Sequence, residues 1–143
     1  MNSTSTDSSI LALDVGTLRI GVARAILSIA LASPLTWLPN DDTFISALKA
    51  LIDEYSVTRL VVGLPRNLSG DDTQQTKAVR QFVANLSGQI NVPIIWQDEA
   101  LTSQKAEAEL AARGKQYEKG DIDALAACYI LDDYLTTLTQ EVQ

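Results

Sequence analysis

The sequence predicts an α/β domain built on a mixed five-stranded sheet of order 3-2-1-4-5, with helices on both faces. Two observations support this prediction. Near the start, two strand patterns are joined by a tight turn at Val15-Gly16-Thr17, which indicates an antiparallel hairpin. After them, helical and strand patterns alternate, which is typical of parallel strands joined by crossover helices. The length of 143 residues suits one such domain.

Short apolar runs bounded by turn residues mark the strands. The five segments are residues 10–14, 19–25, 31–38, 59–63 and 93–97. The third is interrupted by Pro34, which places it at an edge of the sheet, because proline has no N–H to donate to a neighbouring strand. We expect the first, fourth and fifth strands to be parallel, since helices separate them.

Apolar side chains at helical spacing mark the helices. They run from a cap at Asp41 or Asp42 to about residue 55, and over residues 73–86, 102–112 and 121–138. Residues 1–9 are expected to be a disordered lead-in, residues 10–138 the single domain and residues 139–143 a tail.

Composition narrows the chemistry. Histidine is absent and Cys128 is the single cysteine, which excludes a Ser-His-Asp triad, a His-ligated metal site and a disulfide framework. The net charge of −7 does not favour a general nucleic-acid binder, although net charge says little about local patches. No membrane span or signal peptide is expected, and we predict a cytoplasmic protein.

Acidic residues follow the parallel strands, where ligand sites of such sheets form. Asp14 ends the first strand, Asp98 and Glu99 follow the last, and Asp121 and Asp123 begin the final helix. Carboxylates gathered at one edge repel one another unless a cation is present, and their hard oxygen atoms suit Mg²⁺ or Mn²⁺. Two such ions can cleave a phosphodiester bond without histidine.

Each acid also has a structural interpretation. Asp14 could serve the hairpin turn, and Asp98 and Glu99 could be a solvated strand end or charges at a helix N-terminus. Asp123 could likewise be a first-turn acid that interacts favourably with the helix dipole. Asp121 is better explained as a helix N-cap than as a ligand. Residues 121 and 123 lie about 200° apart around a helix, so they are not expected to share an ion, and Asp123 is the better ligand of the two.

Other polar and aromatic residues also have both a structural and a functional interpretation. Gly63–Gly70 is either a turn or a substrate loop in which Arg66 faces a phosphate. A basic loop precedes the last helix. Trp37, Trp96 and Cys128 are expected in the core, the cysteine inert. The candidate phosphate contacts are Arg19, Arg66, Lys115 and Lys119.

Four segments resemble one known family, YqgF, also called RuvX, the Holliday junction resolvases or pre-16S rRNA nucleases. The first is Asp14-Val15-Gly16-Thr17-x-Arg19-Ile20-Gly21-Val22-Ala23, and the second is Val61-Val62-Gly63-Leu64-Pro65-x-Asn67-x-x-Gly70. The third is Asp98-Glu99-x-Leu101-Thr102-Ser103, and the fourth is Lys119-Gly120-x-Ile122-Asp123-x-Leu125-Ala126-Ala127 with Ile130-Leu131-x-x-Tyr134-Leu135. The resemblance runs from about Ile10 to Leu135 in the family's order and spacing.

This resemblance implies an RNase H-like fold and a nuclease that uses Mg²⁺ or Mn²⁺. The family's catalytic and metal-binding acids fall on Asp14, Glu99 and Asp123. Nucleic-acid contacts are expected at Thr17, Arg19, Arg66, Asn67, Lys115 and Lys119. The implied substrate is pre-16S rRNA in the precursor of the small ribosomal subunit, and the implied reaction matures the 5′ end of this RNA. The protein is expected to act as a monomer or a homodimer.

The chain departs from the family at two positions, with Ala100 in place of the usual arginine and Leu18 in place of a frequent lysine. These positions bear on substrate affinity more than on metal binding, because neither is an acid. Three other functions remain open. They are a Holliday junction resolvase acting on branched DNA, a non-catalytic rRNA- or ribosome-associated factor, and an ATP-binding module of the actin type. The last needs a second phosphate loop, which the sequence lacks.

Overall fold

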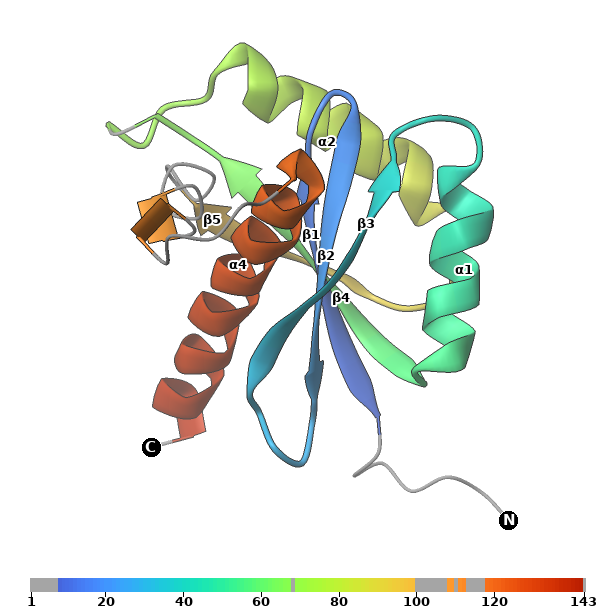
Figure 1. Cartoon of the computed structure of the whole chain (residues 1–143), viewed down its shortest axis with the longest axis vertical. Coiled ribbons are helices and arrows are strands. Elements are labelled where there is room, and N and C mark those ends of the chain that lie inside the picture. The colour runs from blue at the N-terminus through green and yellow to red at the C-terminus, as the bar shows by residue number, and fades with distance from the viewer. Residues whose placement is uncertain (1–7, 68, 100–107, 110, 113–117, 143) are drawn as a thin grey trace.

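The computed structural model describes residues 8–67, 69–99, 108–109, 111–112 and 118–142 (Figure 1). In chain order the elements are β1 (Ser9–Val15), β2 (Arg19–Ile26), β3 (Ala32–Pro39), α1 (Phe44–Glu54), β4 (Val57–Pro65), α2 (Gln74–Ser87), β5 (Ile94–Glu99) and α4 (Lys119–Val142). The five strands and the helices α1 and α2 match the predicted segments to within a few residues at each end. None of the described helices is both long and apolar enough to cross a lipid bilayer.

The strands form one sheet of order β3-β2-β1-β4-β5, which confirms the predicted topology. β1 pairs antiparallel with β2 and parallel with β4, and β4 pairs parallel with β5. β3 is an edge strand, and its pairing with β2 is irregular between Val22 and Ala23, beside Pro34. The carboxyl ends of β1, β4 and β5 therefore lie at one edge of the sheet.

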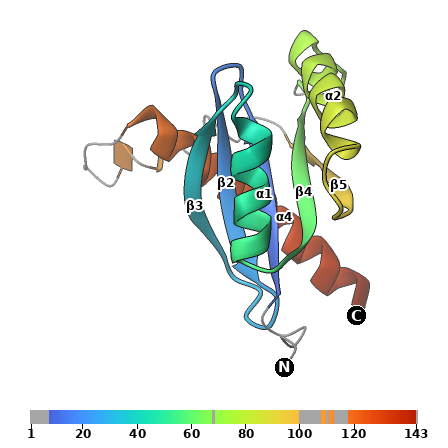
Figure 2. The ribbon, with the colours of Figure 1, turned by 90° about the vertical axis from the view of Figure 1, so that its right-hand side faces the viewer.

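Helices cover both faces of this sheet (Figures 1 and 2). α4 packs across one face on a core that includes Ile10, Ala12 and Val61 of the strands. α1 and α2 pack on the other face, on a core that includes Leu11, Leu13 and Val62. Successive residues of each strand thus belong to opposite cores, as the pleat of a strand requires. This alternation assigns each polar residue at the strand ends to one face.

Small residues bring α4 close to the sheet. Ala12, Ala23 and Ala25 on the strands face Ala126 and Ala127 on the helix, and all five are buried. Short side chains reduce the distance between helix and sheet, so the first turns of α4 are held firmly against β1 and β2. The backbone of α4 is therefore part of the edge at which ligand sites are expected.

Several element boundaries differ from the predicted ones. β1 begins at Ser9 and Ser8 is buried, so the folded chain starts inside the predicted lead-in. α4 continues to Val142 through most of the predicted tail. Most of the helix expected at residues 102–112 lies outside the described residues. The described residues of this range, 108–109 and 111–112, are helical.

The two tryptophans expected in the core are instead 40% exposed. β3 and β5 are the edge strands, and neither Trp37 nor Trp96 has a strand on its outer side to cover it. Cys128 is buried, as predicted. Burial raises the pKa of its thiol to about 11, and the nearby carboxylates of Asp132 and Glu109 add to the shift. Such a thiol is a poor nucleophile at neutral pH.

Candidate active site

The turn between β1 and β2 fixes the first candidate acid. Asp14 is half-buried in β1, and its neighbours Leu13 and Val15 belong to the core under α1 and α2. Alternation along the strand therefore places Asp14 on the face that α4 covers. The turn itself is closed by the N–H of Gly16, which donates to the carbonyl of Arg19 at 2.9 Å. Its outer side is held by Asn40, whose side-chain amide donates to the carbonyl of Gly16 at 2.7 Å.

A glycine brings the last helix to Asp14. Gly21 is the residue of β2 that pairs with Asp14. A Cβ at this position would overlap the backbone carbonyl oxygen of Asp123 and crowd the nitrogen of Ala124. Only a glycine lets the start of α4 approach so closely. Asp123 therefore lies over the residue next to Asp14, although the two acids are far apart in the sequence.

Arg19 holds the side chain of Asp123. Its Nε donates to Oδ2 of Asp123 at 2.7 Å, and the two side chains are 28% and 17% exposed. This ion pair crosses from the beginning of β2 to the first turns of α4. The predicted phosphate contact and the predicted metal ligand are thus partners of each other in this structure.

The third candidate acid comes from β5. Ile95 packs on the core beneath α4, so alternation places Glu99 on that same face. Glu99 is half-buried and pairs with Pro65 of β4. β4 separates Glu99 from β1, and Glu99 lies two residues further along the sheet than the row of Asp14. The two acids are therefore ~12 Å apart at the backbone.

The three acids share one edge and one face, but they are separate groups in this structure. Within the described ranges, no three Asp, Glu, Cys or His side chains lie close enough together to hold one metal ion. Their oxygen donors have the hardness that Mg²⁺ or Mn²⁺ prefers. Their spacing across β4 and the ion pair on Asp123 mean that a metal would have to draw them together. Metal ligation by Asp14, Glu99 and Asp123 stays a prediction.

The two other acids considered at this edge have different surroundings. Asp98 lies on the opposite face, where its Oδ1 accepts from Nε of Arg66 at 3.3 Å. Asp121 accepts from the backbone N–H of Glu118 at 2.9 Å. This is the reach of the third helical residue back to the cap position. Asp121 thus supports the helix start, as expected, but from its third residue and not as the N-cap itself.

The loop after β4 is organised by its own side chains. The side-chain carbonyl of Asn67 accepts from the backbone N–H groups of Ser69 and Asp71 at 3.0 and 2.9 Å. Arg66 contacts Asp72 at 3.0 Å as well as Asp98. Arg80 also binds Asp72, and this hydrogen bond is the main reason that the pKa of Asp72 is lowered. Arg66 and Asn67 therefore have structural roles here, and their contact with nucleic acid stays a prediction.

The remaining predicted contacts are at the same edge. Thr17 is exposed in the β1–β2 turn, and Lys119 is exposed at the first residue of α4. Lys115 lies outside the described residues.

The helix predicted to start at Asp41 or Asp42 has Thr43 at its cap position instead. Asp41 accepts from the N–H and hydroxyl of Thr43, and these two bonds lower its pKa.

Two residues of this edge were not singled out in the sequence. Gly21 could have been found, since a glycine inside a strand often marks a close approach of another backbone. Asn40 carries no local signal, because its partner Gly16 is 24 residues away.

An RNase H-like class follows from the sheet order, the helices on both faces and the acids at the carboxyl edge. The structure of T. thermophilus RuvC in complex with a Holliday junction substrate has the same fold, with a TM-score of 0.55 at 13% identity over 93% of this chain and 96% of that one. Residues 8–137 match the family described as "RuvX: Holliday junction resolvase", and the chain belongs to this family.

Relatives of known name agree with this assignment. A Sulfurihydrogenibium protein is 38% identical over 134 residues, covering 92% of both chains. A Roseiflexus protein is 42% identical over 132 residues, covering 88% of this chain and 92% of its own. Both carry the name "Putative pre-16S rRNA nuclease".

Proposed function

We propose that this protein is a divalent-metal nuclease that hydrolyses phosphodiester bonds in precursor 16S rRNA during maturation of its 5′ end. The observation that carries the proposal is the placement of Asp14, Glu99 and Asp123 on one face of the carboxyl edge. The names of the relatives support RNA as the substrate. The RuvX family description favours a second candidate, cleavage of a DNA four-way junction.

The proposed metal ligands are Asp14, Glu99 and Asp123. Bound Mg²⁺ or Mn²⁺ would supply an activated water molecule and neutralise charge on the leaving oxygen. The protein holds Asp14 on a buried strand and the backbone of Asp123 against Gly21, so the two residues lie near each other before substrate arrives. Arg19 lies beside Asp123 and can turn its guanidinium toward a phosphate when Asp123 takes a metal ion.

The decisive experiment compares Asp14→Asn with wild type in Mn²⁺ on two substrates, a precursor 16S rRNA fragment and a synthetic Holliday junction. Asparagine keeps the shape of the side chain but removes one charged ligand. We expect wild type to cut the RNA, and Asp14→Asn to lose activity by about 100-fold or more. The matched control is Asp98→Asn, which removes an acid from the opposite face and should leave cleavage within a few-fold of wild type.

The outcomes separate the candidates. Cleavage of the junction alone would replace the RNA proposal with the resolvase. Equal activity of Asp14→Asn and wild type would remove Asp14 from the site. No metal-dependent cleavage of either substrate would favour the non-catalytic, ribosome-associated alternative.

A further inference from the structure

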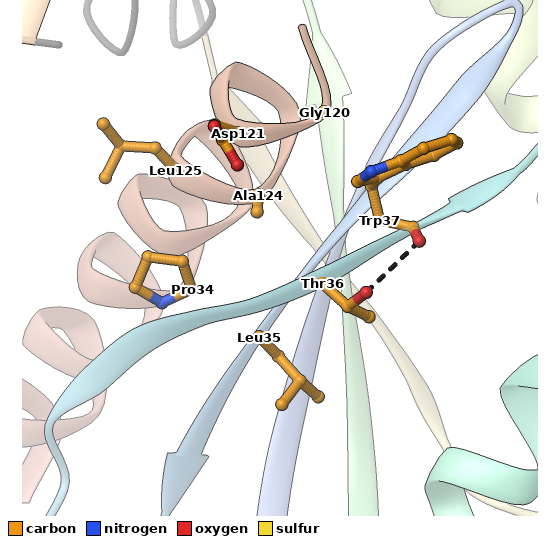
Figure 3. A pocket seen from close by; sticks show the side chains of 8 residues that line it. All are labelled: Pro34, Leu35, Thr36, Trp37, Gly120, Asp121, Ala124 and Leu125. Atoms are coloured by element: carbon orange, nitrogen blue, oxygen red, sulfur yellow. Dashed lines mark hydrogen bonds between the residues drawn. The ribbon is translucent and has the colours of Figure 1, made fainter. Parts of the chain in front are cut away.

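Trp37 presents an aromatic ring on the same face as the candidate acids. It is 40% exposed on the edge strand β3. Its indole ring lies beside Gly120 in the first turn of α4, where an added Cβ would overlap Cδ1 and Nε1 (Figure 3). The ring is thus held in place on one side by the helix backbone and open to solvent elsewhere. The ring therefore presents an aromatic surface of fixed position that a ligand can reach.

The register of the sheet aligns Trp37 with the candidate site. Asp14 pairs with Gly21, and Gly21 pairs with Trp37. The three residues form one row across β1, β2 and β3. The middle of this row lies under the backbone of Asp123. The tryptophan therefore lies about two strand spacings, ~10 Å, from Asp14, a distance that one or two nucleotides can span.

A pocket of about 210 Å³ adjoins the ring. Its walls are mostly apolar and include Pro34, Ala124 and Leu125, between β3 and the start of α4 (Figure 3). The charged residue in its lining is Asp121, whose carboxylate repels a phosphate. A ligand for this pocket therefore needs apolar faces and must not place a phosphate beside Asp121. A flat, apolar group with hydrogen-bond donors at its rim meets both conditions. A nucleobase is such a group, and its amino groups can donate to the carboxylate.

We infer that Trp37 stacks on an unpaired base of the nucleic-acid strand whose backbone lies at the candidate acids. This inference rests on the proposed function and deepens it, because it identifies a binding position for the substrate. The base must be unpaired and unstacked, since the faces of bases inside a duplex are already covered by their neighbours. The strand would pass Arg19 and Lys119 with its phosphates and place one base against the indole.

Trp96 provides a matched control within the same chain. It has the same exposure of 40% and also lies on an edge strand. Its neighbours Ile94 and Ile95 belong to the cores under α1 and α2 and under α4, respectively. Alternation therefore places Trp96 on the face opposite the candidate acids. The two tryptophans differ in the face they occupy, which is the variable that the inference depends on.

Binding is measured in EDTA, so that the result does not depend on cleavage. The probes are a 12-nucleotide single-stranded RNA, DNA of the same sequence and an abasic oligonucleotide of the same length. Trp37→Leu should weaken binding of the RNA by roughly tenfold to a hundredfold, which is the usual contribution of one stacked base. Trp37→Phe should recover most of the affinity, and Trp96→Leu should bind as wild type does.

Three further readouts distinguish stacking from a structural role. The salt dependence of binding should be the same in Trp37→Leu and wild type, because no phosphate contact is removed. The abasic oligonucleotide should bind equally to both. In a Trp96→Phe background, the fluorescence of Trp37 should be quenched by the RNA. The DNA arm tells whether the base is recognised in both kinds of strand.

Equal RNA affinity of Trp37→Leu and wild type would overturn the inference, as would an equal loss on the abasic probe. Neither result would affect metal-dependent cleavage by wild type, which tests the proposed function. Conversely, quenching of Trp37 by RNA in a protein without nuclease activity would support the binding position and reject the catalysis. Failure of the stacking inference and failure of the proposed function are therefore distinguishable.

Discussion

Gly21 is the residue on which the geometry of the candidate site depends most directly. It pairs with Asp14, and it leaves room for the backbone of Asp123. An added methyl group would meet backbone atoms, which cannot rotate away as a flexible side chain can. The start of α4 would have to move off β2 to admit it.

We expect Gly21→Ala to lower the free energy of unfolding by about 3 kcal/mol, at the upper end of the usual cost of overpacking. Cleavage should fall further than stability alone explains, because Asp123 and its partner Arg19 would move apart. Urea denaturation and a cleavage assay under folding conditions measure the two effects.

Gly88→Ala is the matched control. Gly88 caps α2 with a helical backbone, and a Cβ there has nothing within 4 Å. Alanine should leave activity unchanged and stabilise the protein by about 0.4–1 kcal/mol, because it restricts the unfolded chain. If Gly21→Ala behaved like Gly88→Ala, the close approach of α4 would have no role in the site.

Individual residues were predicted unevenly from the sequence. The buried state of Cys128 and the supporting role of Asp121 follow from local pattern, and the structure has both. The exposure of Trp37 and Trp96 was missed although the predicted strand order places both strands at edges, because an apolar stretch of sequence does not show how much of an edge side chain a helix covers. The ion pair of Arg19 with Asp123 joins residues 104 positions apart, and no local signal reports such a contact.

At the scale of elements, hydrogen bonds at the start of α2 connect this helix to the end of β4. Thr73 and Thr76 form a capping box, in which each side chain bonds the backbone or hydroxyl of the other. Thr76 is fully buried, and its hydroxyl also donates to the carbonyl of Pro65 at the end of β4. This one hydroxyl therefore ties the helix to the strand that separates Asp14 from Glu99.

Thr76→Val keeps the volume of the side chain and removes the hydroxyl. The N–H of Thr73 and the carbonyl of Pro65 would both lose a partner at a part-buried position. We expect a loss of about 1–3 kcal/mol in the free energy of unfolding, measured by chemical denaturation. Thr58→Val, at an exposed position of β4, is the control and should change stability by less than about 0.5 kcal/mol. A cost no greater than that of the control would mean that the box is dispensable.

Element types were predictable and element ends were less so. Alternation and helical spacing located every strand and the helices α1, α2 and α4. β4 nevertheless runs on to Pro65, into the predicted loop, because Leu64 and Pro65 pair with Asp98 and Glu99 of β5. That extension depends on a partner strand about 30 residues away, and the residues themselves favour a turn.

At the scale of the whole molecule, the sheet order follows from connection rules. A hairpin places β2 beside β1, and crossover helices place β4 and β5 in parallel on the other side. This order determines which strand ends share an edge, so the shared edge of Asp14 and Glu99 was predictable. The spacing of the carboxylates was not, since it depends on the register of β4 and β5 and on the ion pair of Asp123 with Arg19.

This arrangement predicts how metal should affect the stability of the whole protein. Asp123 is paired with Arg19, and Asp14 and Glu99 are further acids at the same edge. A cation that binds only the folded state stabilises it by mass action, by about 2.7 kcal/mol when its concentration is 100 times Kd. For a domain of this length, that corresponds to a rise in Tm on the order of 5–10 °C.

We therefore expect Mn²⁺ to raise the Tm of wild type by this amount over EDTA, and to raise that of Asp14→Asn by much less. In EDTA, Asp14→Asn should melt at the same temperature as wild type or slightly higher, because one of the like charges at the edge is removed. Asp98→Asn removes an acid on the other face and should keep the full metal response. Thermal melts of the three proteins in both buffers measure this.

Equal responses of wild type and Asp14→Asn would place the metal away from this edge. A lost response in Asp98→Asn as well would indicate general charge screening. A response that depends on Asp14 and not on Asp98 would identify the face covered by α4 as the one that binds metal.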